Sequence, residues 1–262
     1  MFGESRGLII YSRDHKEKDK LVKIFTEKYG KMVFFVKGAH RKNNPLSAAI
    51  MPMTEALYSG DFKTDGLSFL NVAKEIEPFY FLQQDIFANA YATYLLNLAD
   101  AAIVDRESDQ LLYTFLETCL KALNAKKDPE VVTNIFELQI LPRFGISLEL
   151  SGCAVCGNTK GPFDFSEKFH GLLCAKHFDQ DPRRLHADPK ACYLLKIFSQ
   201  LPITRLGKIN VSETTKKNLR TVIDEIYDQY VGIHLKSKHF IDEMKKWEKM
   251  MAPKIDKKNE TD

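Results

Sequence analysis

The chain has 262 residues, of which 44% are hydrophobic and 28% charged, so it can bury real cores and is not a disordered protein. Its formal net charge of +3 is too small to identify a nucleic-acid-binding protein by itself. No apolar run approaches the roughly 18–20 residues that a membrane span needs. The N-terminus has Glu4 and only a short apolar stretch, which is not typical of a signal peptide. We therefore expect a cytoplasmic protein without membrane contact.

Charge is unevenly distributed along the chain. Residues 1–80 carry 13 basic and 10 acidic residues, whereas residues 81–150 carry 5 and 10. A basic front and an acidic middle predict at least two units with different roles. We expect an α+β multidomain protein, with one domain over residues 1–80 and a mainly α-helical domain over residues 81–250.

The first 80 residues read as short strands separated by turns. Four segments are rich in β-forming residues: 7–11, 32–36, 53–58 and 67–76. Residues 18–29 fit neither the strand nor the helix period cleanly and are compatible with both. Four or five short strands with spaced turns predict a small β-barrel.

Helical periodicity then takes over. Apolar residues recur at three- and four-residue steps in 87–98, 112–123 and 132–140. Gly145 should end the third helix, and Pro142 would kink it if it ran on. Asp188 and Pro189 predict a helix start that leads through Leu201. Further helices are predicted after a Ser212 cap and over 237–250, whereas residues 251–262 have almost nothing to bury and should be disordered.

The sharpest motif lies in the irregular segment 146–187. Cys153 and Cys156 form a CxxC pair, and after 17 intervening residues Cys174 and His177 form a CxxH pair. Four such donors suit tetrahedral Zn²⁺ and leave no open position for a substrate, so the spacing predicts a structural zinc site. His170 is the competing fourth ligand, but it lacks the two-residue spacing from Cys174.

Other interpretations of the cysteines are weaker. A redox CxxC is expected in a thioredoxin-like βαβ setting, which the pattern lacks. Cys119 and Cys192 fall on apolar helical faces and are expected to pack in cores. The chain has five cysteines, and this odd number also argues against a disulfide framework.

A second signal is a basic stretch over residues 13–42, with ten basic residues against four acidic ones. A phosphate backbone needs such a cationic track. Outward aromatic rings would add stacking faces for bases, and only one of the adjacent Phe34 and Phe35 can point outward. A solvated lysine-rich surface is the alternative. The candidate nucleic-acid-binding residues are Arg13, Lys16, Lys18, Lys20, Lys23, Lys31, Lys37, Arg41 and Lys42.

Several segments in order resemble the RecO family of bacterial recombination mediators. They are Gly-Leu-Ile-Ile-Tyr at 7–11, Lys-Asp-Lys-Leu-Val at 18–22, Lys-Gly-Ala-x-Arg at 37–41, Phe-Glu-Leu at 136–138, Phe144-Gly145, the CxxCG knuckle and Lys-Ser-Lys-x-Phe at 236–240. The resemblance spans nearly the whole chain. It implies an N-terminal OB-fold, a helical C-terminal domain and, in many members, zinc, with Cys more common than His as the fourth ligand.

The resemblance also implies function. Such proteins bind single- and double-stranded DNA, anneal complementary strands and work with RecR to load the RecA recombinase onto DNA coated by single-strand-binding protein. The chain has no phosphate-loop, nucleophile-elbow or zinc-protease motif. We therefore expect a binding protein and not an enzyme. A zinc-ribbon protein–protein adaptor and a thiol oxidoreductase using Cys153 and Cys156 are the competing hypotheses.

The resemblance further implies an interaction with the acidic, apolar-ended C-terminal tail of single-strand-binding protein. That ligand needs a hydrophobic pocket rimmed by cations. The acidic middle portion would repel it, so we place the pocket in the basic C-terminal portion. The candidate partner-binding residues are Arg205, Lys208, Lys216, Lys217 and Arg220.

Overall fold

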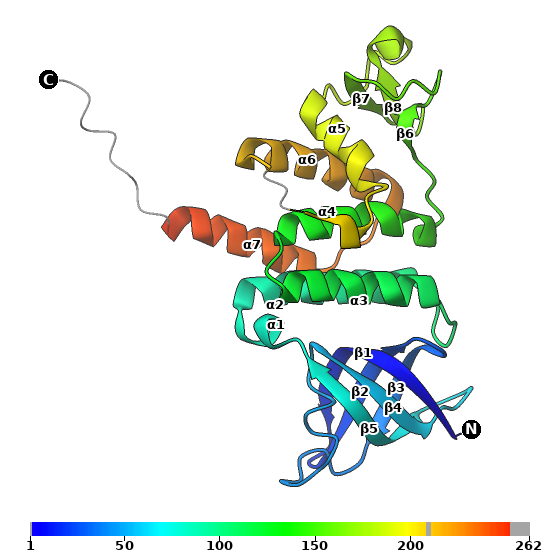
Figure 1. Ribbon diagram of the computed structural model, residues 1–262, viewed down its shortest axis with the longest axis vertical. Helices are drawn as coiled ribbons and strands as arrows, with labels where there is room; N and C mark the ends of the chain where they lie inside the picture. The colour runs from blue at the N-terminus through cyan, green and yellow to red at the C-terminus, as the bar shows by residue number, and fades with distance from the viewer. Residues whose placement is uncertain (1, 208–210, 252–262) are drawn as a thin grey trace, which may run out of the picture.

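The computed structural model describes residues 2–207 and 211–251. Figure 1 shows an elongated stack with a β-barrel at one end, layers of helices in the middle and a small β-sheet at the far end. Lys208 and residues 252–262 of the expected disordered tail lie outside the described residues. No helix in the described part of the chain is long and apolar enough to cross a membrane.

The barrel is a closed five-stranded sheet. Its strands are β1 (Phe2–His15), β2 (Asp19–Thr26), β3 (Gly30–Val36), β4 (Thr54–Asp61) and β5 (Ser68–Pro78). The order β1-β2-β3-β5-β4 closes through β1–β4 pairing, and only β3 and β5 run parallel in this barrel. Residues 18–29 are thus mostly strand. Val22, Ile24, Phe34 and Tyr58 are fully buried inside, and the expected OB-fold is confirmed.

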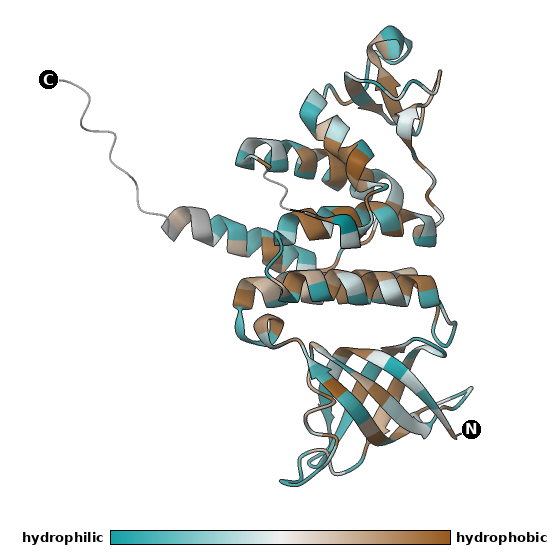
Figure 2. Ribbon diagram, viewed as in Figure 1, coloured by the Kyte–Doolittle hydropathy of each residue, from teal (hydrophilic) through white to brown (hydrophobic). Residues whose placement is uncertain are grey.

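Helices make up the middle of the molecule. The α-helices are α1 (Tyr80–Gln84), α2 (Ile86–Ala102), α3 (Gln110–Asn124), α4 (Pro129–Ile140), α5 (Pro189–Phe198), α6 (Glu213–Ile226) and α7 (Lys236–Met251). The Asp188 and Ser212 side chains accept hydrogen bonds from first-turn backbone N–H groups, so both predicted caps are confirmed. Helix α5 ends at Phe198, before the predicted Leu201. Figure 2 shows apolar residues gathered where α4, α5 and α6 meet.

Two local predictions are refined by the structure. Pro142 does not kink a continuing helix, because the chain tightens into a 3-10 turn (Leu141–Phe144) that Gly145 ends at a φ of 75°. The segment 146–187 is not irregular throughout. It contains a three-stranded sheet of order β6-β8-β7, formed by β6 (Glu149–Cys153), β7 (Phe163–Ser166) and β8 (Gly171–Cys174).

One side of the barrel shares a buried apolar cluster with the helices, and the barrel interior forms a second cluster. Leu8 and Phe25 of the barrel belong to the same buried apolar cluster as α2 and α3. The Tyr113 hydroxyl of α3 donates to the fully buried Glu55 carboxylate of β4 at 2.8 Å, and the Tyr113 ring packs edge-on against Phe25. Burial raises the pKa of Glu55. The helices therefore cover one side of the barrel.

Candidate metal centre and nucleic-acid interface

Four metal-ligand side chains converge at the far end of the molecule. The Nδ1 atom of His177 lies 3.4 Å from the Sγ atoms of both Cys153 and Cys174, and the Sγ atoms of Cys156 and Cys174 lie 3.8 Å apart. A tetrahedral ion with Zn–S bonds of about 2.3 Å and Zn–N bonds of about 2.0 Å separates two sulfurs by about 3.8 Å and sulfur from nitrogen by about 3.5 Å. The cluster therefore fits a metal ion such as zinc.

The small sheet explains why these donors meet. Cys153 ends β6 and Cys174 ends the neighbouring β8, so parallel pairing brings the two thiols together. A tight turn returns Cys156 to the same place, with Gly157 at a φ of 68° donating its N–H to the Cys153 carbonyl at 2.8 Å. His177 lies in the 3-10 helix that starts directly after Cys174.

The electrostatics of the cluster favour a bound cation. Burial opposes ionisation of Cys153, but backbone N–H groups of residues 174, 156 and 155 and the His177 ring lower its pKa to about 6. At Cys156 the backbone N–H of Asn158 favours the thiolate, yet desolvation and the neighbouring thiols raise the pKa overall. Several adjacent thiolates repel one another until a metal ion compensates their charge.

The remaining histidine and cysteine candidates lie elsewhere. His170 is exposed, contacts the Tyr230 ring and does not belong to the cluster, so the geometry selects His177. Cys119 and Cys192 are fully buried in the core, as expected, and burial raises the pKa of both thiols.

Two loops gather basic side chains at one end of the barrel. We name residues 15–19 and 37–44 the basic loops; they leave β1 and β3 at the same end. The His40 N–H donates to the Lys18 carbonyl at 3.2 Å, and the Asp19 carboxylate accepts from the Gly38 N–H at 2.8 Å. These bonds hold together loops that are separated in sequence.

Seven of the nine candidate nucleic-acid-binding residues lie in or beside the basic loops. They are Arg13, Lys16, Lys18, Lys20, Lys37, Arg41 and Lys42. All but Lys20 are exposed, and Lys20 is half-buried and donates to Asp14 at 2.8 Å. Asp14 also contacts His40 at 2.9 Å. The loops thus present a cationic surface. Three carboxylates lie in or beside it, those of Asp14, Glu17 and Asp19, and Asp14 is already in an ion pair.

Lys23 and Lys31 lie elsewhere. Their side chains point at the helices, where Lys23 Nζ is 2.6 Å and Lys31 Nζ 3.2 Å from Asp100 Oδ1. Lys31 is only 10% exposed and also reaches Asp105. Because these ammonium groups are covered and neutralised, we remove both lysines from the proposed DNA-contacting set.

The structure also decides between the adjacent phenylalanines of β3. Phe34 is fully buried in the barrel core, whereas Phe35 is half-buried on the outer face. Tyr11 packs against the helical core, with the Arg13 guanidinium 5.5 Å from its ring centre. Phe35 is therefore the outward ring that the sequence alone could not identify.

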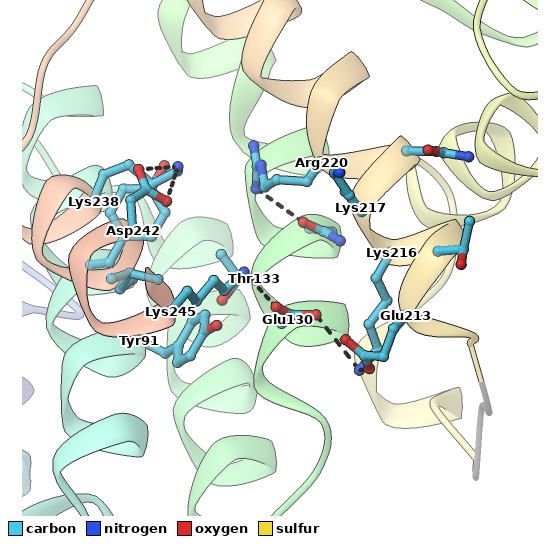
Figure 3. Close-up of a pocket in the computed structure, with 15 residues that line it drawn as sticks. Tyr91, Glu130, Thr133, Glu213, Lys216, Lys217, Arg220, Lys238, Asp242 and Lys245 are labelled. Atoms are coloured by element: carbon cyan, nitrogen blue, oxygen red, sulfur yellow. Dashed lines mark hydrogen bonds and ion pairs between the residues drawn. The ribbon is translucent and has the colours of Figure 1, made fainter. Parts of the chain in front are cut away.

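A pocket of about 480 Å³ lies among α2, α4, α6 and α7 (Figure 3). Three predicted partner-binding residues line it: Lys216, Lys217 and Arg220. Arg205 is exposed in a 3-10 turn and is not among its lining residues. The acidic middle of the chain contributes Glu130, Thr133 and Asn134, so the pocket is less confined to the basic C-terminal portion than expected.

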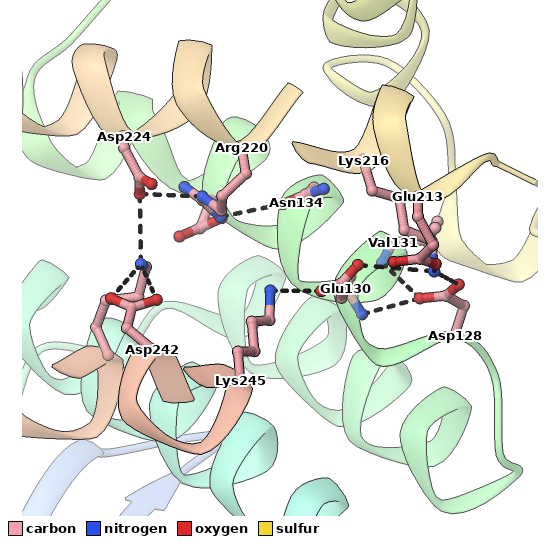
Figure 4. A network of polar contacts seen from close by, with 12 residues as sticks. Asp128, Glu130, Val131, Asn134, Glu213, Lys216, Arg220, Asp224, Asp242 and Lys245 are labelled. Atoms are coloured by element: carbon pink, nitrogen blue, oxygen red, sulfur yellow. Dashed lines mark hydrogen bonds and ion pairs between the residues drawn. The ribbon is translucent and has the colours of Figure 1, made fainter. Parts of the chain in front are cut away.

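Ion pairs occupy four of the pocket's five cations: Lys216, Arg220, Lys238 and Lys245 (Figure 4). Lys216 Nζ lies 2.6 Å from Asp128 and also contacts Glu130 and Glu213. Arg220 donates to the fully buried Glu137 carboxylate at 2.5 Å and to Asn134 at 3.0 Å.

The sequence pattern proposed Lys216 and Arg220 as partner-binding cations and could not show that they are already paired, because their partners include residues at the start of α4 and within it. Lys217 is exposed and in no ion pair among the described residues, and it is the better candidate cation.

Sequence comparisons give matches along nearly the whole chain. The family model for the N terminal of recombination protein O matches residues 1–79, and that for its C terminal matches residues 83–239. The DNA repair protein RecO of Enterococcus faecalis is 56% identical, covering 98% of each chain. Proteins of the same name from Lactococcus lactis subsp. cremoris and Streptococcus suis are 48% and 46% identical over 95% and 97% of this chain, and 98% and 96% of their own.

Proposed function

The chain belongs to the recombination protein O family of non-catalytic DNA repair proteins, and from this premise we propose that it binds single- and double-stranded DNA and anneals complementary strands. We further propose that, together with RecR, it helps to load RecA onto DNA coated by single-strand-binding protein. A role on the bacterial chromosome implies a cytoplasmic location.

The observation that carries the proposal is the convergence of the basic loops on one end of the OB-fold barrel. A backbone hydrogen bond and a bond to the Asp19 carboxylate fix the loops, so their exposed cations form a preorganised phosphate-binding surface. Such a surface needs no covalent chemistry to anneal strands. It lowers the repulsion between two polyanions and raises their local concentration.

We propose a structural role for zinc at Cys153, Cys156, Cys174 and His177. A bound ion would tie together β6, β8 and the 3-10 helix after β8, and this 3-10 helix has no buried residue to anchor it otherwise. Four protein donors leave no coordination site for a substrate, which supports a stabilising ion and argues against a catalytic one.

We also propose that the pocket of Figure 3 receives the acidic tail of single-strand-binding protein. Ile241 and the Tyr91 and Tyr94 rings offer apolar contact, and Lys217 offers an exposed cation at the wall. The half-buried Arg220 lines the same pocket, and its covered Nη2 atom has no hydrogen-bond partner among the described residues. A carboxylate of the tail would satisfy that donor.

A strand-annealing assay tests the proposed function. The wild type should accelerate pairing of complementary oligonucleotides, and the Lys37→Ala, Arg41→Ala variant should be slower. The charge-matched control is Lys28→Ala, Lys190→Ala, because Lys28 is exposed on the turn at the opposite end of β2 and β3 and Lys190 is exposed on α5. A wild type that binds no DNA, yet keeps its metal and binds protein partners, would support the zinc-ribbon adaptor instead.

A further inference from the structure

Two outward-facing aromatic rings, one half-buried and one exposed, lie side by side on the barrel. Phe35 of β3 and Phe69 of β5 are register partners in the parallel β3–β5 pair. Their ring centres are 5.9 Å apart with planes at 69°. Phe69 is 41% exposed. Neither ring is part of the barrel's buried core, so their packing inside the fold does not account for them.

Two polar groups extend this pair into a line. The His15 ring, at the end of β1, is 6.0 Å from Phe35 and nearly perpendicular to it. The Lys63 ammonium group lies 4.8 Å from the centre of the Phe69 ring. The line therefore starts beside one basic loop and ends at an exposed lysine that covers a ring face through a cation–π contact.

The framework under the line is fixed. Arg106, from the segment between α2 and α3, donates to the backbone carbonyls of Lys63, at 3.3 Å, and of Gly66. The Ser68 hydroxyl accepts from the Lys63 N–H at 3.1 Å. These bonds hold the backbone between β4 and β5 while the Lys63 side chain stays exposed. The backbone that leads into Phe69 is thus preorganised.

We propose that Phe35 and Phe69 are a base-stacking site for unpaired nucleotides of single-stranded DNA, an inference that rests on the proposed function. When a base stacks on Phe69, Lys63 leaves the ring and pairs with a phosphate. Lys37, two residues after Phe35, and the basic loop beside His15 bind the phosphates on the other side. Bases within a duplex are already stacked and paired, so the site adds affinity only for unpaired bases.

The test compares three DNA probes by fluorescence anisotropy: oligothymidylate, an abasic strand of equal length and a duplex. Stacking is worth about 1–3 kcal/mol per base, so the wild type should bind oligothymidylate at least about tenfold more tightly than the abasic strand. The Phe35→Ala, Phe69→Ala variant should lose this preference and keep its affinity for the abasic strand and the duplex. Lys63→Ala should lower the salt slope for oligothymidylate by about 0.7.

Two controls keep the test decisive. Phe35→Leu, Phe69→Leu retains apolar bulk but no ring face, and should behave like the alanine variant without a folding defect. Tyr193→Ala removes an exposed ring from α5, remote from the barrel, and should bind like the wild type.

A wild type that binds the abasic strand and oligothymidylate equally, or ring variants that keep the preference, would overturn the stacking site and leave DNA binding intact. A wild type that binds none of the three probes would overturn both the site and the proposed function.

Discussion

Replacing Arg220 by Met should destabilise the protein by about 3–5 kcal/mol, because it leaves a buried carboxylate without its ion pair. Glu137 is fully buried and is paired with Arg220 at 2.5 Å. Its remaining side-chain hydrogen bond comes from the Tyr94 hydroxyl at 2.7 Å, which does not neutralise the charge. Arg220 also contacts Asp224 at 3.0 Å, so one substitution breaks a network that joins α2, α4 and α6.

Thermal unfolding measures the effect. A loss of 1 kcal/mol lowers the midpoint by about 2–4 °C in chains of roughly this size, so Arg220→Met should lower it by about 6–20 °C. Lys217→Met, one turn earlier on the exposed face of α6, should stay within about 0.5 kcal/mol of the wild type. Adding Glu137→Gln to Arg220→Met should recover much of the loss, because the uncompensated charge is gone. If Arg220→Met unfolds like the wild type, the pair does not hold the helices together.

Elemental analysis should find one zinc per chain in the wild type and in His170→Ala, but less than about 0.2 zinc per chain in Cys174→Ser. Retention of zinc by Cys174→Ser would contradict the proposed ligand set. Glu55→Gln tests burial of the carboxyl beneath α3. Because burial raises the pKa of Glu55, ionisation of this carboxyl removes stability as pH rises above its ordinary value of about 4.5. The variant cannot ionise, so it should gain stability relative to the wild type as pH rises from there in urea unfolding, and a pH-independent difference would count against this. Lys217→Ala should weaken binding of a tail peptide of single-strand-binding protein several-fold in fluorescence anisotropy, and equal affinities would move the peptide site elsewhere.

The barrel and the metal ligands could be predicted because their signals are local. Strand alternation and turn residues are read within a few positions, and two short Cys and His pairs suffice to predict a tetrahedral site. The sheet that carries those ligands was missed. Its strands have four or five residues, and β7 and β8 are buried on both faces, so they show no alternation.

Contacts between residues far apart in the sequence could not be predicted from local sequence patterns. Lys23 and Lys31 look like exposed strand residues, and only the fold brings Asp100 over them. Arg220 has the sequence context of a surface helix, but its partner Glu137 comes from a helix that begins more than 80 positions earlier. The outward direction of Phe35 likewise depends on strand register, which single-sequence patterns fix poorly for a strand with apolar residues on both faces.

The salt dependence of single-stranded DNA binding tests the central claim most directly. If the basic loops bind phosphates, Lys37→Ala, Arg41→Ala should weaken binding equally for poly-pyrimidine and mixed sequences and lower the slope of log affinity against log salt by about 1.4, or about 0.7 per lost contact. The charge-matched control Lys28→Ala, Lys190→Ala removes two exposed lysines away from the loops and should leave the slope unchanged. Equal slopes for the wild type and the loop variant would contradict the proposal that this end of the barrel binds DNA.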